Sequence, residues 1–347
     1  MRLWRVLLVL LFCSGFAQTV SATLPDAAEL QPPQHTVQVG IGVYVLSVNR
    51  VADASDPFPS YDAEVFLDLR WRDPRLAWGD GKGAEPRVLT EHNAETLLNE
   101  IWHPAIELEN AERARTREHL KLIVRSDGAV EYEERFNAVL KTRFDLIRFP
   151  FDRQTLEMDI ESSSWTRDEL VFKVLPSHTG FNPDMVAPEW RFLDHSTELR
   201  GEREIRAEDE FHELIFRLSV ERDPGFYLWK LILPLFVIVA LSWSVFWMTG
   251  EQSSGRMMRA FLALLAVVAS HRVISGYLPR ITEITFLDAV VYAAYFFTAL
   301  TIIENVLVHR AAARGAADVA EKIDRRSQLW VPSGFIVLCV VLWFGYH

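Results

Sequence analysis

The segment Met257–Ile274 reads MMRAFLALLAVVASHRVI, an apolar run interrupted by Arg259, His271 and Arg272. Its length is close to the roughly 20 residues that an α-helix needs to cross a bilayer. Charged side chains inside a membrane usually face the interior of a helix bundle or a water-filled path, because lipid does not solvate them. We therefore interpret this segment as a transmembrane helix with one side turned away from lipid.

The side of this helix that would face water follows from helix geometry, in which successive residues are about 100° apart. Five positions fall within about 60° of Leu265 and form one narrow face: Met258, Leu262, Ala269, Arg272 and Gly276. Copies of the helix arranged around this face would enclose a lumen, where rings of Leu262 and Leu265 would form an apolar gate that closes by dewetting. Leucines that simply pack against neighbouring helices would give the same pattern, so helix geometry alone leaves both interpretations open.

Apolar segments on both sides of this helix predict four membrane spans in all, at residues 226–248, 254–275, 286–308 and 329–346. The segment between the third and fourth spans is rich in basic residues, as cytoplasmic loops are: Arg310, Arg314, Lys322, Arg325 and Arg326. Because the number of spans is even, the N-terminal part of the chain and its C terminus are then both expected outside the cytoplasm.

Residues 1–22 have the pattern of a secretory signal peptide. Two arginines precede the apolar run Val6–Cys13, and Val20-Ser21-Ala22 provides a small-residue cleavage site. The alternative, a fifth membrane span, is disfavoured because this apolar run is shorter than a bilayer requires. We expect a mature chain that begins near Thr23 and has an exported N-terminal domain.

The expected exported domain, residues 23–225, contains 40 acidic and 24 basic residues, against 7 and 12 in the rest of the chain. Within it, alternating or β-branched runs such as Tyr61–Trp71 and Glu213–Val220 are separated by turn signals. This pattern predicts an all-β, immunoglobulin-like sandwich, followed by a four-helix transmembrane bundle over residues 226–347. The sequence has 2 cysteines, and both lie outside the expected exported domain, so we expect no disulfide and no cysteine-based metal site there.

The sequence Phe149-Pro150-Phe151-Asp152 lies in a predicted loop between two strands, Thr142–Leu156. It resembles the signature loop of the pentameric ligand-gated ion channels, the Cys-loop receptor superfamily. Further motifs occur in the order found in that family: Trp71-Arg72-Asp73, Arg222-Asp223-Pro224-Gly225-Phe226-Tyr227, Pro234 and Tyr277-Leu278-Pro279-Arg280. The resemblance covers nearly all of the expected mature chain.

Two departures from the animal receptors resemble the bacterial branch of the family. Thr142 and Leu156 stand where animal receptors have the two cysteines that close the loop, and the segment between the third and fourth spans is very short. The resemblance implies a homopentamer in the inner membrane of a bacterium, with a periplasmic N-terminal domain and no cofactor. It also implies a small-molecule or ion agonist, which the sequence does not identify, bound between subunits.

The resemblance places a coupling site where the exported domain meets the membrane helices. Asp152 and Arg222 are candidates for an ion pair there. Breaking a buried pair costs about 3–5 kcal/mol, whereas the alternative, an exposed pair, contributes at most about 1 kcal/mol. Other residues expected at this junction are Pro150, Phe151, Leu278 and Pro279.

The ligand site implied by the resemblance lies between neighbouring exported domains. The segment Ser196–Glu210 is its expected capping loop, and because that segment has no aromatic residue, we do not expect an aromatic box for an ammonium ligand. The carboxylates could instead be solvated surface, and the tryptophan could belong to the sandwich core. The candidate wall residues are Arg70, Glu107, Glu109, Glu161 and Trp165.

The charges give opposing indications about the permeant ion. An acidic exported domain would concentrate cations near the pore, and on this basis we favour cations. Against this, Gly255 occupies the position where cation channels of the family usually carry a glutamate, and a ring of Arg272 would repel cations. His271 would allow gating by protons, because histidine titrates near neutrality.

Two other functional classes fit parts of the sequence. A membrane-tethered sensor or assembly protein without a conducting pore would have the same architecture. An exported hydrolase is disfavoured, since the sequence contains neither Gly-x-Ser-x-Gly nor His-Glu-x-x-His.

Overall fold

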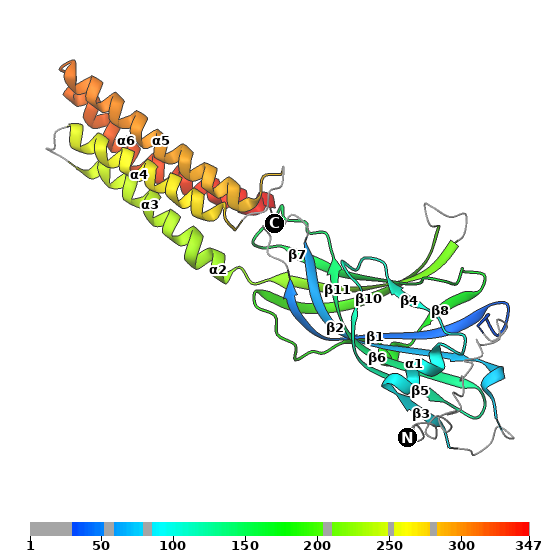
Figure 1. The fold of residues 1–347 in the computed structure, drawn as a ribbon. Helices are drawn as coiled ribbons and strands as arrows, with labels where there is room; N and C mark the ends of the chain where they lie inside the picture. Colours follow the sequence, from blue (N-terminus) through cyan, green and yellow to red (C-terminus); the bar gives the residue numbers. More distant parts are fainter. Residues whose placement is uncertain are drawn as a thin grey trace, which may run out of the picture.

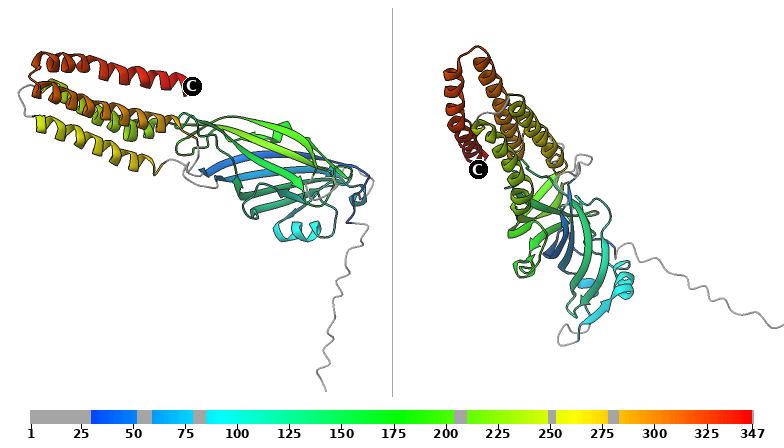
Figure 2. Two further views of the ribbon diagram at one scale, coloured as in Figure 1. Left: turned by 90° about the horizontal axis from the view of Figure 1, so that it is seen from above. Right: turned by 90° about the vertical axis from the view of Figure 1, so that its left-hand side faces the viewer.

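The structure is a computed structural model that describes residues 30–51, 59–78, 85–203, 210–248, 253–277 and 283–346. The molecule is elongated, with a β-sandwich at one end and a bundle of long helices at the other (Figure 1, Figure 2). The expected signal peptide, residues 1–22, lies outside the described residues, as do two of the expected coupling residues, Leu278 and Pro279.

Two sheets form the sandwich, which confirms the predicted all-β domain. The larger sheet contains β1 (Val37–Val51), β2 (Ser60–Arg72), β3 (Arg87–Thr90), β5 (Thr116–Val124), β6 (Ala129–Lys141), β8 (Leu170–Val174) and β9 (Gly180–Phe181). The smaller sheet contains β4 (Ile106–Leu108), β7 (Arg153–Ser162), β10 (Trp190–Arg203) and β11 (Glu210–Arg222). The strand orders are β3-β5-β6-β2-β1-β8, with β9 paired to β1, and β10-β11-β7-β4.

The sandwich closes because its strands alternate between core-facing and outward-facing side chains. In β6 every second residue from Val130 to Leu140 is buried, and β7 alternates in the same way from Gln154 to Ser162. Short helices connect the strands: η1 (Pro74–Leu76), α1 (Glu91–Leu98) and η2 (Pro176–His178).

One core-facing position of β6 is charged. Glu134 is 0% exposed and is paired with Arg115 and Arg117, at 3.1 and 2.9 Å. Burial by itself raises the pKa of Glu134, but the ion pairs and hydrogen bonds outweigh it, so the pKa lies below its ordinary value. Arg115 also donates a hydrogen bond of 2.8 Å to the carbonyl oxygen of Ile106. The buried carboxylate thereby fixes β4, the strand that carries the expected ligand residue Glu107.

The segments that follow the sandwich form four helices long and apolar enough to cross a membrane, as the sequence predicts. The first runs over Gly225–Trp247 and combines α2 (Gly225–Tyr227), a wide π-helical turn η3 (Leu228–Ile232), α3 (Leu233–Trp243) and η4 (Ser244–Trp247). Pro234 has no N–H to bond the carbonyl four residues earlier, which accounts for the wide turn before it. The others are α4 (Ser253–Ile274), α5 (Phe286–Ala313) and α6 (Ala317–Tyr346).

The prediction that the basic segment between the third and fourth spans is a loop is wrong. Helix α6 begins at Ala317, so Lys322, Arg325 and Arg326 lie on a helix, and Arg310 lies on α5. The first turns of α6 are polar and would not be recognised as part of an apolar span. They are held by burial of Ala320 and by an ion pair between Asp324 and α4, neither of which a hydropathy pattern contains.

The expected capping loop is also shorter than predicted. Strand β10 continues to Arg203 and pairs with β11 through this region, for example Thr197 with Phe216. Residues 196–203 are therefore strand, and residues 204–209 lie outside the described part of the chain.

Candidate channel and coupling site

The predicted pore-lining face of α4 is exposed in the single chain. Met258, Leu262 and Leu265 are 62%, 55% and 63% exposed, and Ala269 and Arg272 are exposed as well. The opposite side of the helix, about 180–220° from Leu265, carries the buried residues: Arg256, Ala260, Val267 and Ile274. Helix α4 thus packs within its own subunit through one side and presents a mainly apolar face, which also carries Arg272, outside it.

The bundle places this face at an edge. Helix α4 packs against α3 and α5, and α5 packs against α6. Figure 2 (left) shows α4 along one edge of the bundle and α6 along the opposite edge. The exposed face of α4 is therefore accessible without displacement of any helix of the bundle.

The expected signature loop connects β6 to β7 and rests on the ends of the membrane helices. Phe149 packs edge-on against Tyr227 at 4.7 Å between ring centroids. Phe151 packs against Phe286 of α5 at 5.6 Å and Trp343 of α6 at 4.7 Å. Within the described residues, this loop therefore contacts three of the four spans. The sequence did not indicate the α5 and α6 contacts.

Asp152 and Arg222 form a buried ion pair at the base of the sandwich. Arg222 donates from Nε to Oδ1 at 2.8 Å and from NH2 to Oδ2 at 3.2 Å, and the residues are 1% and 3% exposed. Gln154 donates a further hydrogen bond of 2.6 Å to Asp152. Because the pair is desolvated and held in bidentate geometry, it belongs to the class in which loss of one partner is costly.

Aromatic rings enclose the guanidinium of Arg222. Its carbon lies 4.2 Å from the ring centroid of Trp190, 4.9 Å from Phe149 and 5.9 Å from Tyr227. Cation–π contacts of this kind are strongest where the cation is desolvated. Trp190 belongs to the sandwich core and Tyr227 to the first membrane span, so Arg222 links the two domains directly.

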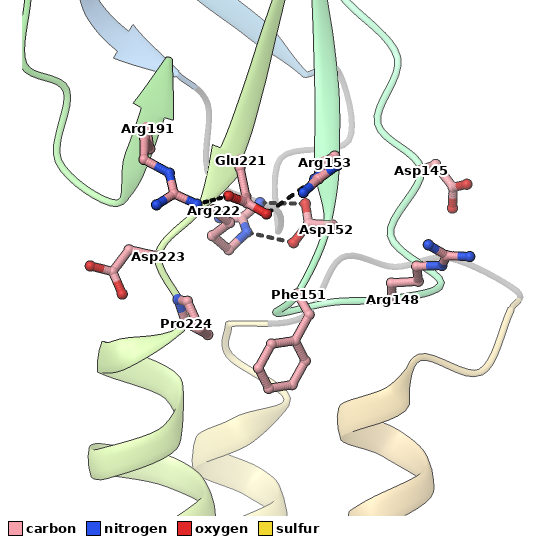
Figure 3. A pocket seen from close by; sticks show the side chains of 10 residues that line it. All are labelled: Asp145, Arg148, Phe151, Asp152, Arg153, Arg191, Glu221, Arg222, Asp223 and Pro224. Atoms are coloured by element: carbon pink, nitrogen blue, oxygen red, sulfur yellow. Dashed lines mark hydrogen bonds and ion pairs between the residues drawn. The ribbon is translucent and has the colours of Figure 1, made fainter. Parts of the chain in front are cut away.

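A pocket of about 670 Å³ opens beside this pair, at the junction of the two domains (Figure 3). Above the buried pair lie two ion pairs nearer the surface, in which Arg153 and Arg191 both contact Glu221. These two arginines lower the pKa of Glu221 through hydrogen bonds. The lining consists of Asp145, Arg148, Phe151, Asp152, Arg153, Arg191, Glu221, Arg222, Asp223 and Pro224.

The expected ligand residues divide between the two sheets. Glu107 of β4 lies opposite Glu161 of β7, and the backbone of Glu109 donates to Asp159 at 3.0 Å. Trp165 is half-buried, donates its indole N–H to the carbonyl of His103 at 2.9 Å and contacts Trp102. The structure therefore brings the acidic candidates together, while Trp165 packs against the sandwich core.

Arg70 lies apart from these residues, on β2 of the larger sheet. It donates to Nε2 of His178 at 2.9 Å, and Nδ1 of the same ring lies 3.3 Å from Asp68. Partial burial raises the pKa of Asp68, and the neighbouring His178 partly offsets this. The sequence did not predict this cluster, because His178 is 108 residues from Arg70.

A family model for the neurotransmitter-gated ion-channel ligand-binding domain matches residues 25–224. This match covers the whole sandwich with its signature loop and buried pair. The chain belongs to the pentameric ligand-gated ion channels. The family consists of channels rather than enzymes, and this channel subunit has a ligand-binding sandwich outside the membrane and four membrane spans.

Relatives of this channel subunit come from bacteria and animals. The proton-gated ion channel of Gloeobacter violaceus is 28% identical over 322 residues, 92% of this chain and 86% of the relative. A gamma-aminobutyric acid receptor subunit beta-like protein of Drosophila melanogaster is 25% identical over 79% of this chain, and the rat glycine receptor subunit beta is 25% identical over 78%. The chain spans only 56% and 55% of these two animal subunits.

Among the described residues, no group of three or more His, Cys, Asp or Glu side chains could hold a metal ion. The junction contains a buried ion pair and aromatic contacts that join the sandwich to the membrane helices.

Proposed function

We propose that five identical copies of this chain form an ion channel in which the α4 helices surround the pore. The observation that carries this proposal is the distribution of exposure on α4, where the gate candidates Leu262 and Leu265 are exposed and the opposite face is buried. An apolar face alone could also contact lipid, but this face carries the exposed Arg272 as well. A charged side chain is costly in lipid and usually faces a water-filled path, which favours the pore.

An agonist bound between exported domains would open this pore through β7 and β11. Strand β7 carries Glu161 near one end and begins directly after Asp152, while β11 leaves the capping hairpin and ends at Arg222. The buried ion pair therefore joins the far ends of both strands. A shift of either strand reaches Arg222, which continues through Pro224 into the first span.

The agonist site itself is proposed at Glu107, Glu109, Glu161 and Trp165 on one subunit, with Arg70 contributed by the neighbour. The separation of Arg70 onto the other sheet supports this division. The acidic side chains favour a cationic group on the agonist, and the proton-gated relative from Gloeobacter violaceus makes protons a candidate as well.

Cysteine accessibility tests which face of α4 lines the pore. In a Cys339→Ala background, Ala269→Cys is expected to react with a membrane-impermeant thiol reagent from the outer side at least about tenfold faster than Val267→Cys, because thiolates form in water rather than in apolar surroundings. The two positions are two residues apart, on opposite faces. Protein reconstituted in liposomes and analysed by mass spectrometry gives both rates.

Equal labelling rates at the two positions would contradict the assignment of this face of α4 to the pore. A lipid-facing control, Val340→Cys on α6, is expected to remain unlabelled, since Val340 is exposed in the single chain at a membrane-spanning position.

A further inference from the structure

Glu304 is a buried carboxyl group within the third membrane span, and the channel mechanism above does not use it. It is 5% exposed, and neither of its carboxylate oxygens accepts a hydrogen bond from an N–H or hydroxyl donor within the described part of the chain. The carboxyl group of Asp324 is its hydrogen-bonding neighbour when one of the two acids is protonated. An ionised carboxylate without partners is strongly disfavoured in such surroundings. Its protonation state therefore depends on the charged groups around it.

Two charged side chains from the neighbouring helices act on Glu304. Arg256 of α4 binds Asp324 of α6 in bidentate fashion, with NH1 to Oδ2 at 3.0 Å and NH2 to Oδ1 at 2.5 Å. Among the described residues, these are the groups that interact electrostatically with Glu304. The Nε atom of Arg256 is also buried and has no partner there.

The cluster thus contains two carboxyl groups, of Glu304 and Asp324, and one guanidinium, of Arg256. The guanidinium forms its ion pair with Asp324. If both carboxyl groups were ionised, the cluster would hold a net negative charge within the membrane span, which is costly. We propose that the Glu304–Asp324 pair binds one proton, held on Glu304 while Arg256 is paired with Asp324. A proton shared by two coupled acids belongs to the pair as a whole.

The proton comes from the cytoplasmic side. Arg256 lies in the first turn of α4 and Asp324 in the early turns of α6, close to the connection between α5 and α6 at residues 314–316. This is the end of the bundle far from the sandwich (Figure 1). The site is therefore separate from any proton site in the exported domain.

Loss of the proton would change which neighbouring helix forms an ion pair with the first turn of α4. An ionised Glu304 would compete with Asp324 for Arg256 and offer an acceptor to its free Nε. The pore helix would then be tied to α5 rather than to α6. This consequence for gating rests on the proposed channel function, whereas proton binding itself does not.

Infrared difference spectra of the reconstituted full-length protein, wild type minus variant, test the proton site. Near neutral pH the wild type is expected to show the carbonyl stretch of a protonated, non-hydrated carboxylic acid, and Glu304→Gln is expected to lose it. Asp324→Asn should lose the band as well, because Arg256 then pairs with Glu304. Asp318→Asn, an exposed acid of the same helix end, is the matched control and should retain it.

A band that persists in Glu304→Gln, or that is absent from the wild type, would overturn the proposal. This measurement requires no open pore, so its failure would leave the proposed channel function intact. Conversely, a protein that conducts no ions could still show the proton. In excised patches, a cytoplasmic pH step should shift activation several-fold in the wild type and not in Glu304→Gln. Identical responses would overturn the link to gating.

Discussion

Replacing Asp152 with alanine is expected to abolish agonist-evoked current while pentamers still reach the membrane. The substitution leaves Arg222, which is 3% exposed, without the carboxylate that it binds through two hydrogen bonds. Removing one partner of a buried pair costs about 3–5 kcal/mol. The lost ion pair weakens the contact between β7 and β11 at the point where the sandwich meets the first span. Agonist binding is then expected to no longer move the membrane helices.

The control for this substitution is Glu221→Gln in the same pocket. Glu221 pairs with Arg153 and Arg191 on the surface (Figure 3), and exposed pairs contribute at most about 1 kcal/mol. Glu221→Gln should therefore conduct nearly as the wild type does. Chemical cross-linking at the cell surface measures assembly. Asp152→Asn keeps the shape of the side chain and controls for misfolding of the alanine variant. Wild-type currents in both Asp152 variants would contradict the coupling role.

Replacing Leu265 with serine is expected to raise the current without agonist by at least about tenfold. If five Leu265 side chains form the closed gate, each contributes apolar surface that keeps the constriction dry. A buried leucine side chain is worth about 1.5–3 kcal/mol relative to water, and 1.4 kcal/mol corresponds to a tenfold change in an equilibrium. A hydroxyl at this ring would hydrate the constriction and stabilise the open state.

Leu329→Ser provides the matched comparison for the gate. Leu329 is 70% exposed and Leu265 is 63% exposed in the single chain, but Leu329 lies on α6 at the opposite edge of the bundle from α4 (Figure 2). It should leave the basal current unchanged. Holding currents recorded before any agonist application distinguish the two variants, and equal basal currents in both would place the gate elsewhere.

The sequence indicated the main elements because their signals are local. Alternation in Tyr61–Trp71 marks β2, and the apolar run 226–248 marks the first span. The family resemblance also predicted Arg222 as the partner of Asp152, although 70 residues separate them. That inference depended on resemblance, since no local pattern connects the end of β11 to the end of a distant loop.

The elements that the sequence did not indicate depend on contacts between distant residues. The polar start of α6 forms a helix because Asp324 reaches Arg256 across the bundle, 68 residues away. The cluster of Arg70, His178 and Asp68 forms because η2 packs against β1, next to β2, and places His178 beside these two side chains. Glu304, inside the apolar segment 286–308, and Arg256, directly before the run Met257–Ile274, were visible in the sequence, and these charges were the signal that could have pointed to the membrane cluster.

Arg272 is exposed on α4 in the single chain, so the two opposing indications about the permeant ion both remain. A ring of arginines in the lumen favours anions, whereas the acidic exported domain favours cations. These two effects act at different places along the same path. Ion substitution during a current recording decides which of them dominates.

The most direct test of a ligand-gated pore is a current recording from cells that express the full-length chain, with amines, carboxylic acids and protons applied in turn on the outer side. We expect a current that follows at least one of these applications, whose reversal potential shifts when the permeant ion is substituted and which disappears in Asp152→Ala. A wild-type protein that assembles at the surface and remains silent across the whole series would contradict the account and favour a non-conducting sensor.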